Sequence, residues 1–96
     1  MTAVLDPLIH APARLQACAI LSSASEVEFA MLRDTLAVSD SVLSKHISAL
    51  TDAGYLHSRK GVHAGRRTTW VGLTDAGRQA LRDHVTALRR MIDGVE

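Results

Sequence analysis

Apolar residues recur along most of this chain with the spacing of an α-helix. Their periodicity predicts four helices, over residues 12–23, 29–36, 40–53 and 75–92. Pro12 suits the first turn of a helix, and the hydroxyl of Thr74 can cap the last helix. Ser39 or Asp40 can cap the third helix in the same way. Gly54 ends that helix, because glycine takes positive φ at little cost.

The segments between these helices favour short strands. Residues 26–28 alternate and could add a single rung to a sheet. Residues 55–60 and 68–73 are rich in β-branched and aromatic side chains, which predicts two strands. Between them, residues 61–67 predict a hairpin with a long basic tip.

The order is helix, short strand, helix, tight turn, helix, strand, basic loop, strand, helix. Two short helices joined by the three-residue turn 37–39 form a helix-turn-helix unit, in which the second helix enters the DNA major groove. A β-hairpin directly after this unit corresponds to the wing of a winged helix-turn-helix domain. The pattern predicts one domain over residues 1–96, mainly α with a small β-hairpin wing (α+β).

Two stretches of sequence carry a resemblance to a known family. Residues 38–56, VSDSVLSKHISALTDAGYL, resemble the recognition-helix signature of the MarR and ArsR bacterial transcriptional regulators. Residues 65–77, GRRTTWVGLTDAG, resemble the second wing strand and following helix start of the MarR type. The match covers roughly residues 10–78 and is most similar to short single-domain winged-helix proteins related to MarR. The resemblance implies a sequence-specific DNA-binding transcriptional regulator that acts as a repressor.

The sequence departs from the family pattern at three points. Ala37 stands where such turns often carry glycine, and alanine at positive φ costs ~1 kcal/mol. Ala64 stands near the place where MarR wings often carry an acid that orients the wing arginine. The ArsR-type cysteine pair is missing, so metal sensing through thiolates is not supported.

Composition narrows the classes of function. At 96 residues and 47% hydrophobic, the chain can form one packed core. No apolar run approaches the ~20 residues that cross a bilayer, and no secretory signal is visible. Cys18 is the only cysteine, so we expect no disulfide, a buried structural thiol and a cytoplasmic location. We find no catalytic motif and no metal-ligand spacing among the histidines, so we expect no enzyme activity, no cofactor and no metal.

Charge is distributed unevenly although the net charge is only +1. Residues 1–44 carry five acids against two arginines, whereas residues 45–67 carry five basic side chains against one acid. Residues 68–96 are neutral, with four charges of each sign. A basic centre predicts one face that meets a polyanion, although a solvated loop with surplus arginine would carry the same charge.

The third helix and the wing supply the expected DNA contacts. If Leu43, Ile47 and Leu50 face the core, the opposite face carries serines and one lysine, which suit close approach to base edges. An ordinary solvated face is the alternative, but serine is a poor helix former. Strand alternation points Arg66 and Arg67 in opposite directions, and the sequence leaves open which one contacts DNA. The expected DNA-contacting residues are Ser39, Ser41, Ser44, Lys45, His46, Ser48, Lys60, His63, Arg66 and Arg67.

The terminal helices predict a homodimer. The last helix carries an apolar stripe that is wider than a small domain needs to cover one edge. The expected interface residues are Leu8, Ile9, Leu15, Leu81, Val85, Leu88, Met91 and Ile92. Double-stranded DNA is the expected partner, and a small-molecule effector of unknown identity is a further candidate. The alternative function is a winged-helix protein–protein interaction module without DNA binding, which would need neither a basic wing nor a serine-lined helix.

Overall fold

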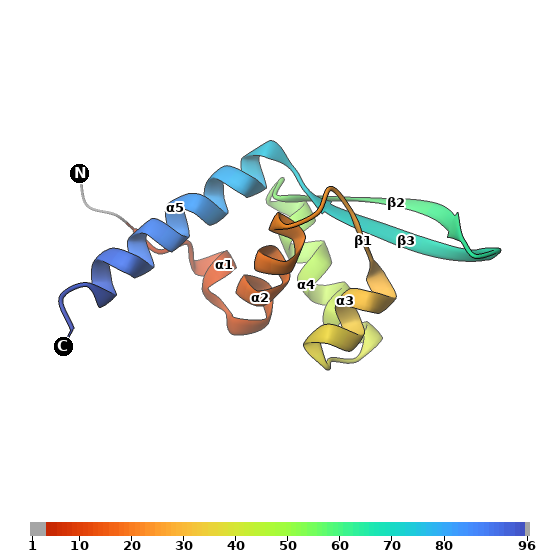
Figure 1. The fold of residues 1–96 in the computed structure, drawn as a ribbon, viewed down its shortest axis with the longest axis horizontal. Helices are drawn as coiled ribbons and strands as arrows, with labels where there is room; N and C mark the ends of the chain where they lie inside the picture. Colours follow the sequence, from red (N-terminus) through yellow and green to blue (C-terminus); the bar gives the residue numbers. More distant parts are fainter. Residues whose placement is uncertain (1–3, 96) are drawn as a thin grey trace.

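A computed structural model describes residues 4–95, which form a helical body from which part of one small sheet projects (Figure 1). The elements are α1 (Pro7–His10), α2 (Pro12–Ser22), β1 (Val27–Glu28), α3 (Phe29–Leu36), α4 (Asp40–Asp52), β2 (Leu56–His63), β3 (Arg66–Leu73) and α5 (Asp75–Ile92). The molecule measures 50 × 25 × 21 Å. The C-terminal part of α5 projects at one end of the long axis and the β2–β3 hairpin projects at the other.

Local sequence signals set the ends of the predicted helices. The α5 helix begins after Thr74, whose hydroxyl accepts a 2.9 Å hydrogen bond from the backbone N–H of Gly77. The α4 helix ends just before Gly54, which takes a φ of 82°. The predicted helices at 29–36 and 75–92 have the bounds of α3 and α5, and α4 ends one residue earlier than predicted.

The short helix α1 was not predicted, because four residues are too few to show a helical period. Asp6 starts it by accepting hydrogen bonds from the backbone N–H groups of Leu8 and Ile9. The α1 helix packs against α2, α4 and α5. Ile9 is buried as a result and belongs to the hydrophobic core.

The sheet has three antiparallel strands in the order β1-β3-β2. The predicted long tip at residues 61–67 is wrong, because β2 continues to His63 and β3 begins at Arg66. Ala64 and Gly65 alone make the turn, with φ values of 51° and 76°. Two successive positive φ values are typical of a type I′ turn, which matches the right-handed twist of a hairpin.

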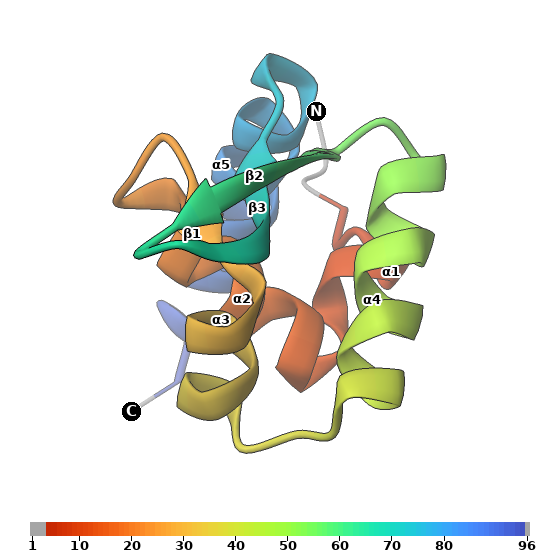
Figure 2. The same cartoon turned by 90° about the vertical axis from the view of Figure 1, so that its right-hand side faces the viewer.

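Figure 2 shows α2 and α3 below the sheet and α4 beside them. Aliphatic side chains from these elements and from all three strands form the core. Leu21 of α2, Leu32 of α3, Leu43 of α4 and Val71 of β3 are completely buried there. Cys18 is buried among them, and burial raises the pKa of its thiol to about 11. The thiol is therefore protonated at neutral pH, as expected of a structural cysteine.

A polar cluster joins α1 to α5 and to the chain just after α4. The Asp6 carboxylate accepts a 2.7 Å hydrogen bond from the Tyr55 hydroxyl, and the Asp6 backbone N–H donates to Nδ1 of His84 at 2.9 Å. Burial alone would raise the pKa of Asp6, but the hydrogen bonds to its carboxylate hold that pKa below its usual value. His84 is 1% exposed, and burial lowers its pKa. The fold therefore favours a neutral His84 ring.

Candidate nucleic-acid interface

Helix α4 is anchored by one face and presents the other to solvent. Leu43, Ile47 and Leu50 lie in the core. The exposed side chains on the remaining faces include Ser41, Ser44, Lys45 and Ser48. The α4 helix therefore presents a row of hydroxyl groups and one amine, which can donate to or accept from the edges of DNA bases.

The N-terminal end of α4 is held by two polar side chains with different roles. Ser39 is the cap, because its Oγ accepts a 3.2 Å hydrogen bond from the backbone N–H of Val42. Asp40, the other candidate cap, instead accepts a 2.9 Å hydrogen bond from the Arg33 guanidinium of α3. This ion pair joins the two helices across the tight turn and offsets the negative charge of Asp40.

His46 lies away from the exposed serine row. Its ring is half-buried, and Nδ1 lies 3.3 Å from Nη1 of Arg14 on α2. Burial lowers the pKa of His46, and the charge of Arg14 lowers it further. His46 therefore favours its neutral form and packs α4 against α2 rather than adding a positive charge to the exposed face.

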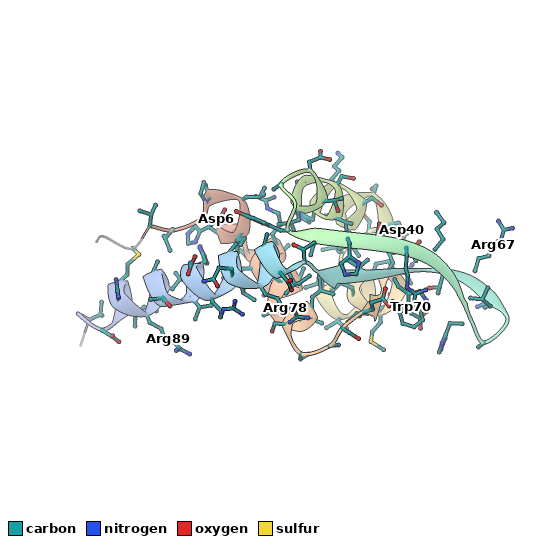
Figure 3. All side chains as sticks on the ribbon, turned by 90° about the horizontal axis from the view of Figure 1, so that it is seen from above. Asp6, Asp40, Arg67, Trp70, Arg78 and Arg89 are labelled. Carbon is teal, nitrogen blue, oxygen red and sulfur yellow. The ribbon has the colours of Figure 1, made fainter. Side chains whose placement is uncertain are left out.

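The register of the wing sorts its side chains onto two faces. Successive side chains of a strand point to opposite sides, and residues directly opposite in a pair share a side. The pairing of Lys60 with Thr69 and of Val62 with Arg67 defines a front face. The front face consists of Ser58, Lys60, Val62, Arg67 and Thr69, and the back face of Arg59, His63, Arg66, Thr68 and Trp70. Figure 3 shows Arg67 and Trp70 on opposite sides of the hairpin.

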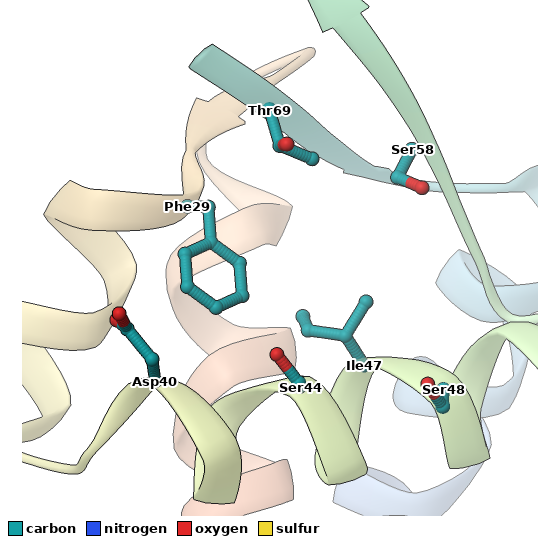
Figure 4. Close-up of a pocket in the computed structure, with 7 residues that line it drawn as sticks. All are labelled: Phe29, Asp40, Ser44, Ile47, Ser48, Ser58 and Thr69. Atoms are coloured by element: carbon teal, nitrogen blue, oxygen red, sulfur yellow. The ribbon is translucent and has the colours of Figure 1, made fainter.

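A groove between α4 and the wing shows that the front face lies on the α4 side (Figure 4). Phe29 and Ile47 supply apolar side chains to this groove. The hydroxyl groups that line it belong to Ser44, Ser48, Ser58 and Thr69. The front face of the wing and the serine row of α4 thus form one continuous hydrogen-bonding surface.

The two wing arginines point to different faces, as strand alternation predicted. Arg67 lies on the front face with Lys60, and neither has a carboxylate within ion-pair distance among residues 4–95. Arg66 lies on the back face opposite His63. The structure groups Lys60 and Arg67 with the α4 serines, whereas His63 and Arg66 face away from them.

Sequence reasoning missed Ser58 and Thr69 as lining residues of this groove. Both lie on the front face, two residues from Lys60 and Arg67 respectively along their strands. A correct turn length would have revealed them, because the pairing of His63 with Arg66 fixes the face of every other wing residue.

The expected dimer residues differ in how much surface they offer. Ile9 is completely buried and Leu81 is 8% exposed, so both belong to the core of the single chain. Met91 and Ile92 are 62% and 63% exposed near the end of α5. The half-buried residues of the set are Leu8, Leu15, Val85 and Leu88. The apolar surface available to a second copy is therefore concentrated along the C-terminal half of α5.

The described residues hold no cluster of three or more histidine, cysteine, aspartate or glutamate side chains that could bind a metal ion. None of the helices among residues 4–95 combines the length and the apolar character that crossing a membrane requires.

Comparison with known proteins agrees with this geometry. Residues 13–92 match the model of a family described as a winged helix DNA-binding domain. The chain is 25% identical over 89 residues to an uncharacterised protein of Methanocaldococcus jannaschii. The aligned region covers 93% of this chain and 97% of that protein.

Solved structures of transcriptional regulators share the fold. A transcriptional regulator homologue from Pyrococcus horikoshii OT3 is 27% identical with a TM-score of 0.86, covering 93% of this chain and 88% of that one. A MarR-family regulator from Silicibacter pomeroyi is 28% identical with a TM-score of 0.62, covering 93% of this chain and 62% of that one. The predicted winged helix-turn-helix fold and its resemblance to MarR-type regulators are confirmed.

Proposed function

We propose, from the premise that the chain belongs to the winged helix DNA-binding domain family, that it is a sequence-specific transcriptional repressor acting as a homodimer. One observation carries the proposal. The serine row of α4 and the free cations Lys60 and Arg67 lie on the same side of the molecule, on either side of one hydroxyl-lined groove. A DNA reader needs both parts on one side, because base contacts specify the sequence while phosphate contacts fix the register.

In this proposal α4 lies in the major groove. Short serine side chains let the helix approach base edges closely, and Lys45 can reach guanine acceptors or a phosphate. Ser39, Ser41, Ser44 and Ser48 are all exposed for this role. His46 contributes by holding α4 against α2, since its ring is half-buried against Arg14.

The wing contacts the DNA backbone or a narrow minor groove through Lys60 and Arg67. Their cations account for a salt-dependent part of the affinity, because each neutralised phosphate releases about 0.9 counterion. His63 and Arg66 lie on the back face and add phosphate contacts only near the tip of the hairpin.

The proposed dimer is held by the terminal helices. The C-terminal part of α5 projects from the body (Figure 1). An apolar ridge on this helix runs from Val85, which packs against the core, through Leu88 to the exposed Met91 and Ile92. Leu8 and Leu15 extend the apolar surface from the N-terminal helices, while Ile9 and Leu81 support it from beneath. Two copies would place two α4 helices about 34 Å apart, on successive turns of the major groove. A dimer seated on a promoter blocks access to it, which is the basis of the proposed repression.

DNase footprinting on the promoter of the protein's own gene tests the proposal. We expect two protected half-sites with centres about one helical turn apart and related by an approximate palindrome. Lys45→Ala should change which sequences are protected, and Ser44→Ala should act in the same direction more weakly. A folded protein that protects no sequence over its background DNA binding would contradict the proposal and favour a protein-interaction module.

Sedimentation equilibrium at micromolar concentration tests the dimer separately. We expect a mass of two chains for the wild type. Leu88→Glu should shift the equilibrium towards the single-chain mass of 10.3 kDa, because a charge would enter the apolar ridge. A constant single-chain mass as the wild-type concentration rises would contradict the dimer.

A further inference from the structure

We propose that Glu26 and Glu28 are specificity residues of the DNA interface, because Glu26 pairs with Arg59 and Glu28 contacts His63 on the back face of the wing, while Lys60 and Arg67 on the front face stay free to meet DNA. The inference rests on the proposed DNA binding. It assigns a role to two acids that neither α4 nor the front face uses.

Glu26 holds Arg59 against the back face. The Nε and Nη2 atoms of Arg59 donate to the two carboxylate oxygens of Glu26 at 2.8 and 2.9 Å. Such two-point pairing is stronger and more directional than a single contact. The Arg59 guanidinium also lies 5.6 Å from the centroid of the Trp70 ring, within the range of a cation–π interaction. Arg59 is therefore held along the sheet by Glu26 and Trp70, although its side chain is 55% exposed.

Glu28, at the end of β1 and two residues after Glu26, makes a second set of contacts. It accepts a 3.0 Å hydrogen bond from the Thr68 hydroxyl, and its other oxygen lies 3.5 Å from Nε2 of His63. The His63 ring meets Trp70 edge to face at 5.7 Å between centroids. Thr68, His63 and Trp70 all belong to the back face, so the carboxylate of Glu28 lies on the same side of the wing as that of Glu26.

Burial shows that both acids depend on these partners. The side chains of Glu26 and Glu28 are only 24% and 22% exposed, whereas Arg59 and His63 are 55% and 58% exposed. A carboxylate that has lost most of its water needs a paired donor. The pairs therefore place negative charge against the sheet, beneath the cations that point outwards.

The front face has no such partner among residues 4–95. Lys60 follows Arg59 directly in the sequence, yet it points to the α4 side, where its charge is free. On the back face Arg66 alone has no carboxylate partner among residues 4–95. Without Glu26, the Arg59 cation would be a second charge there that attracts any phosphate backbone. Specificity is a difference between two affinities, so Glu26 and Glu28 raise it by lowering non-specific binding.

The double variant Glu26→Gln with Glu28→Gln tests this role, because glutamine keeps the shape and removes the charge. The probes are a labelled 30-bp duplex of random sequence and the footprinted operator, each titrated in 50–200 mM potassium chloride. We expect non-specific affinity to rise roughly three- to tenfold, with a salt slope steeper by up to about 0.9 for each freed cation. Operator affinity should rise less, so the ratio between the two falls. Adding Arg59→Gln should return the non-specific affinity towards the wild-type value.

A matched control is Asp75→Asn with Asp83→Asn, which makes the same change of net charge on α5. Thermal unfolding followed by circular dichroism establishes that each variant is folded. Unchanged non-specific affinity in the folded double glutamine variant, or an equal rise in the control, would overturn the proposal.

Arg59→Gln alone is an independent test that leaves Glu26 unpaired. It should weaken non-specific binding, because the carboxylate then repels phosphates, and an unchanged dissociation constant would again overturn the role. If the wild type binds neither duplex, the proposed function fails and not the role of the acids alone.

Discussion

The α1–α5 junction and the α4–wing surface both contain polar side chains, but they use them in opposite ways. At the junction, Asp6 accepts from two backbone N–H groups and from Tyr55, and its own N–H donates to His84. On the α4–wing surface, the row of exposed serines includes Ser44 and Ser48, and Lys60 and Arg67 carry unpaired charge within the described residues. Paired polar groups fix the fold, whereas unpaired exposed groups are free to bind. The comparison predicts that mutations in the two regions will affect different measurements.

The largest effect on stability is expected at Asp6. Asp6→Ala removes the cap of α1 and leaves the Tyr55 hydroxyl without its acceptor, so the free energy of unfolding should fall by about 2–4 kcal/mol. Urea denaturation measures this loss. Asp6→Asn, which keeps one oxygen for the cap, should lose about half as much or less. Equal losses for the two variants would show that the cap of α1 does not contribute to stability.

The junction should also make stability depend on pH. Burial lowers the pKa of His84, and the nearby His10 lowers it further, while Asp6 partly opposes both. The unfolded chain then binds more protons than the folded chain below the ordinary histidine pKa of 6.5. Stability should therefore fall as the pH drops from 7.5 towards 5, by at most about 1.4 kcal/mol per pH unit for each such histidine.

Urea denaturation of His84→Gln across the same pH range isolates this contribution. Its stability should fall less steeply with acid than that of the wild type, and His46 should account for part of the remaining slope, since burial lowers its pKa as well. If the free energy of unfolding depends on pH equally in the variant and the wild type, His84 does not cause the loss of stability in acid.

A smaller effect is expected at the turn that places α4. Ala37 has a φ of 56°, which alanine adopts at a cost, and its N–H bonds to the Asp34 carbonyl. Ala37→Gly should raise the free energy of unfolding by about 0.5–1 kcal/mol. Ala53 has an ordinary φ of −79°, so Ala53→Gly should have the opposite sign. Stabilisation by both glycines, or by neither, would show that the φ of Ala37 is not strained.

The smallest effect on stability is expected on the α4–wing surface. Ser44→Ala removes an exposed hydroxyl that makes no hydrogen bond to another side chain or to the backbone within the described residues, so stability should change by less than about 0.5 kcal/mol. The same variant should alter the preferred DNA sequence in a selection from random duplexes. A stability loss comparable to that of Asp6→Ala would remove the distinction between the two regions.

Much of the fold follows from local signals in the sequence. Thr74 and Ser39 mark the starts of α5 and α4 with hydroxyl caps, and Gly54 marks the end of α4 with positive φ. The α1 helix has only Asp6 and Pro7 as signals and lacks a measurable period. Its position depends on contacts with α5, including the hydrogen bond to His84, which is 78 residues away in the sequence. Such a contact has no local signature.

The candidate site was predicted less completely, for a geometric reason. Ala64 takes a φ of 51° in the hairpin turn, where glycine, asparagine or aspartate is usual. An alanine therefore gives no sequence signal for a two-residue turn. A longer loop at that point leaves the register open, and a one-residue slip exchanges the two faces of the wing. The residues with DNA-binding chemistry could be selected, but their division between the faces required the pairing of His63 with Arg66.

The most direct test of the account compares two adjacent wing variants, Arg67→Ala and Arg66→Ala, in operator binding at 50–200 mM salt. Both remove one arginine, so composition and net charge are matched. The account predicts that Arg67→Ala weakens binding clearly and flattens the salt slope by about one counterion, whereas Arg66→Ala has a much smaller effect. Equal losses for the two variants, or a larger loss for Arg66→Ala, would contradict a DNA surface formed by α4 and the front face of the wing.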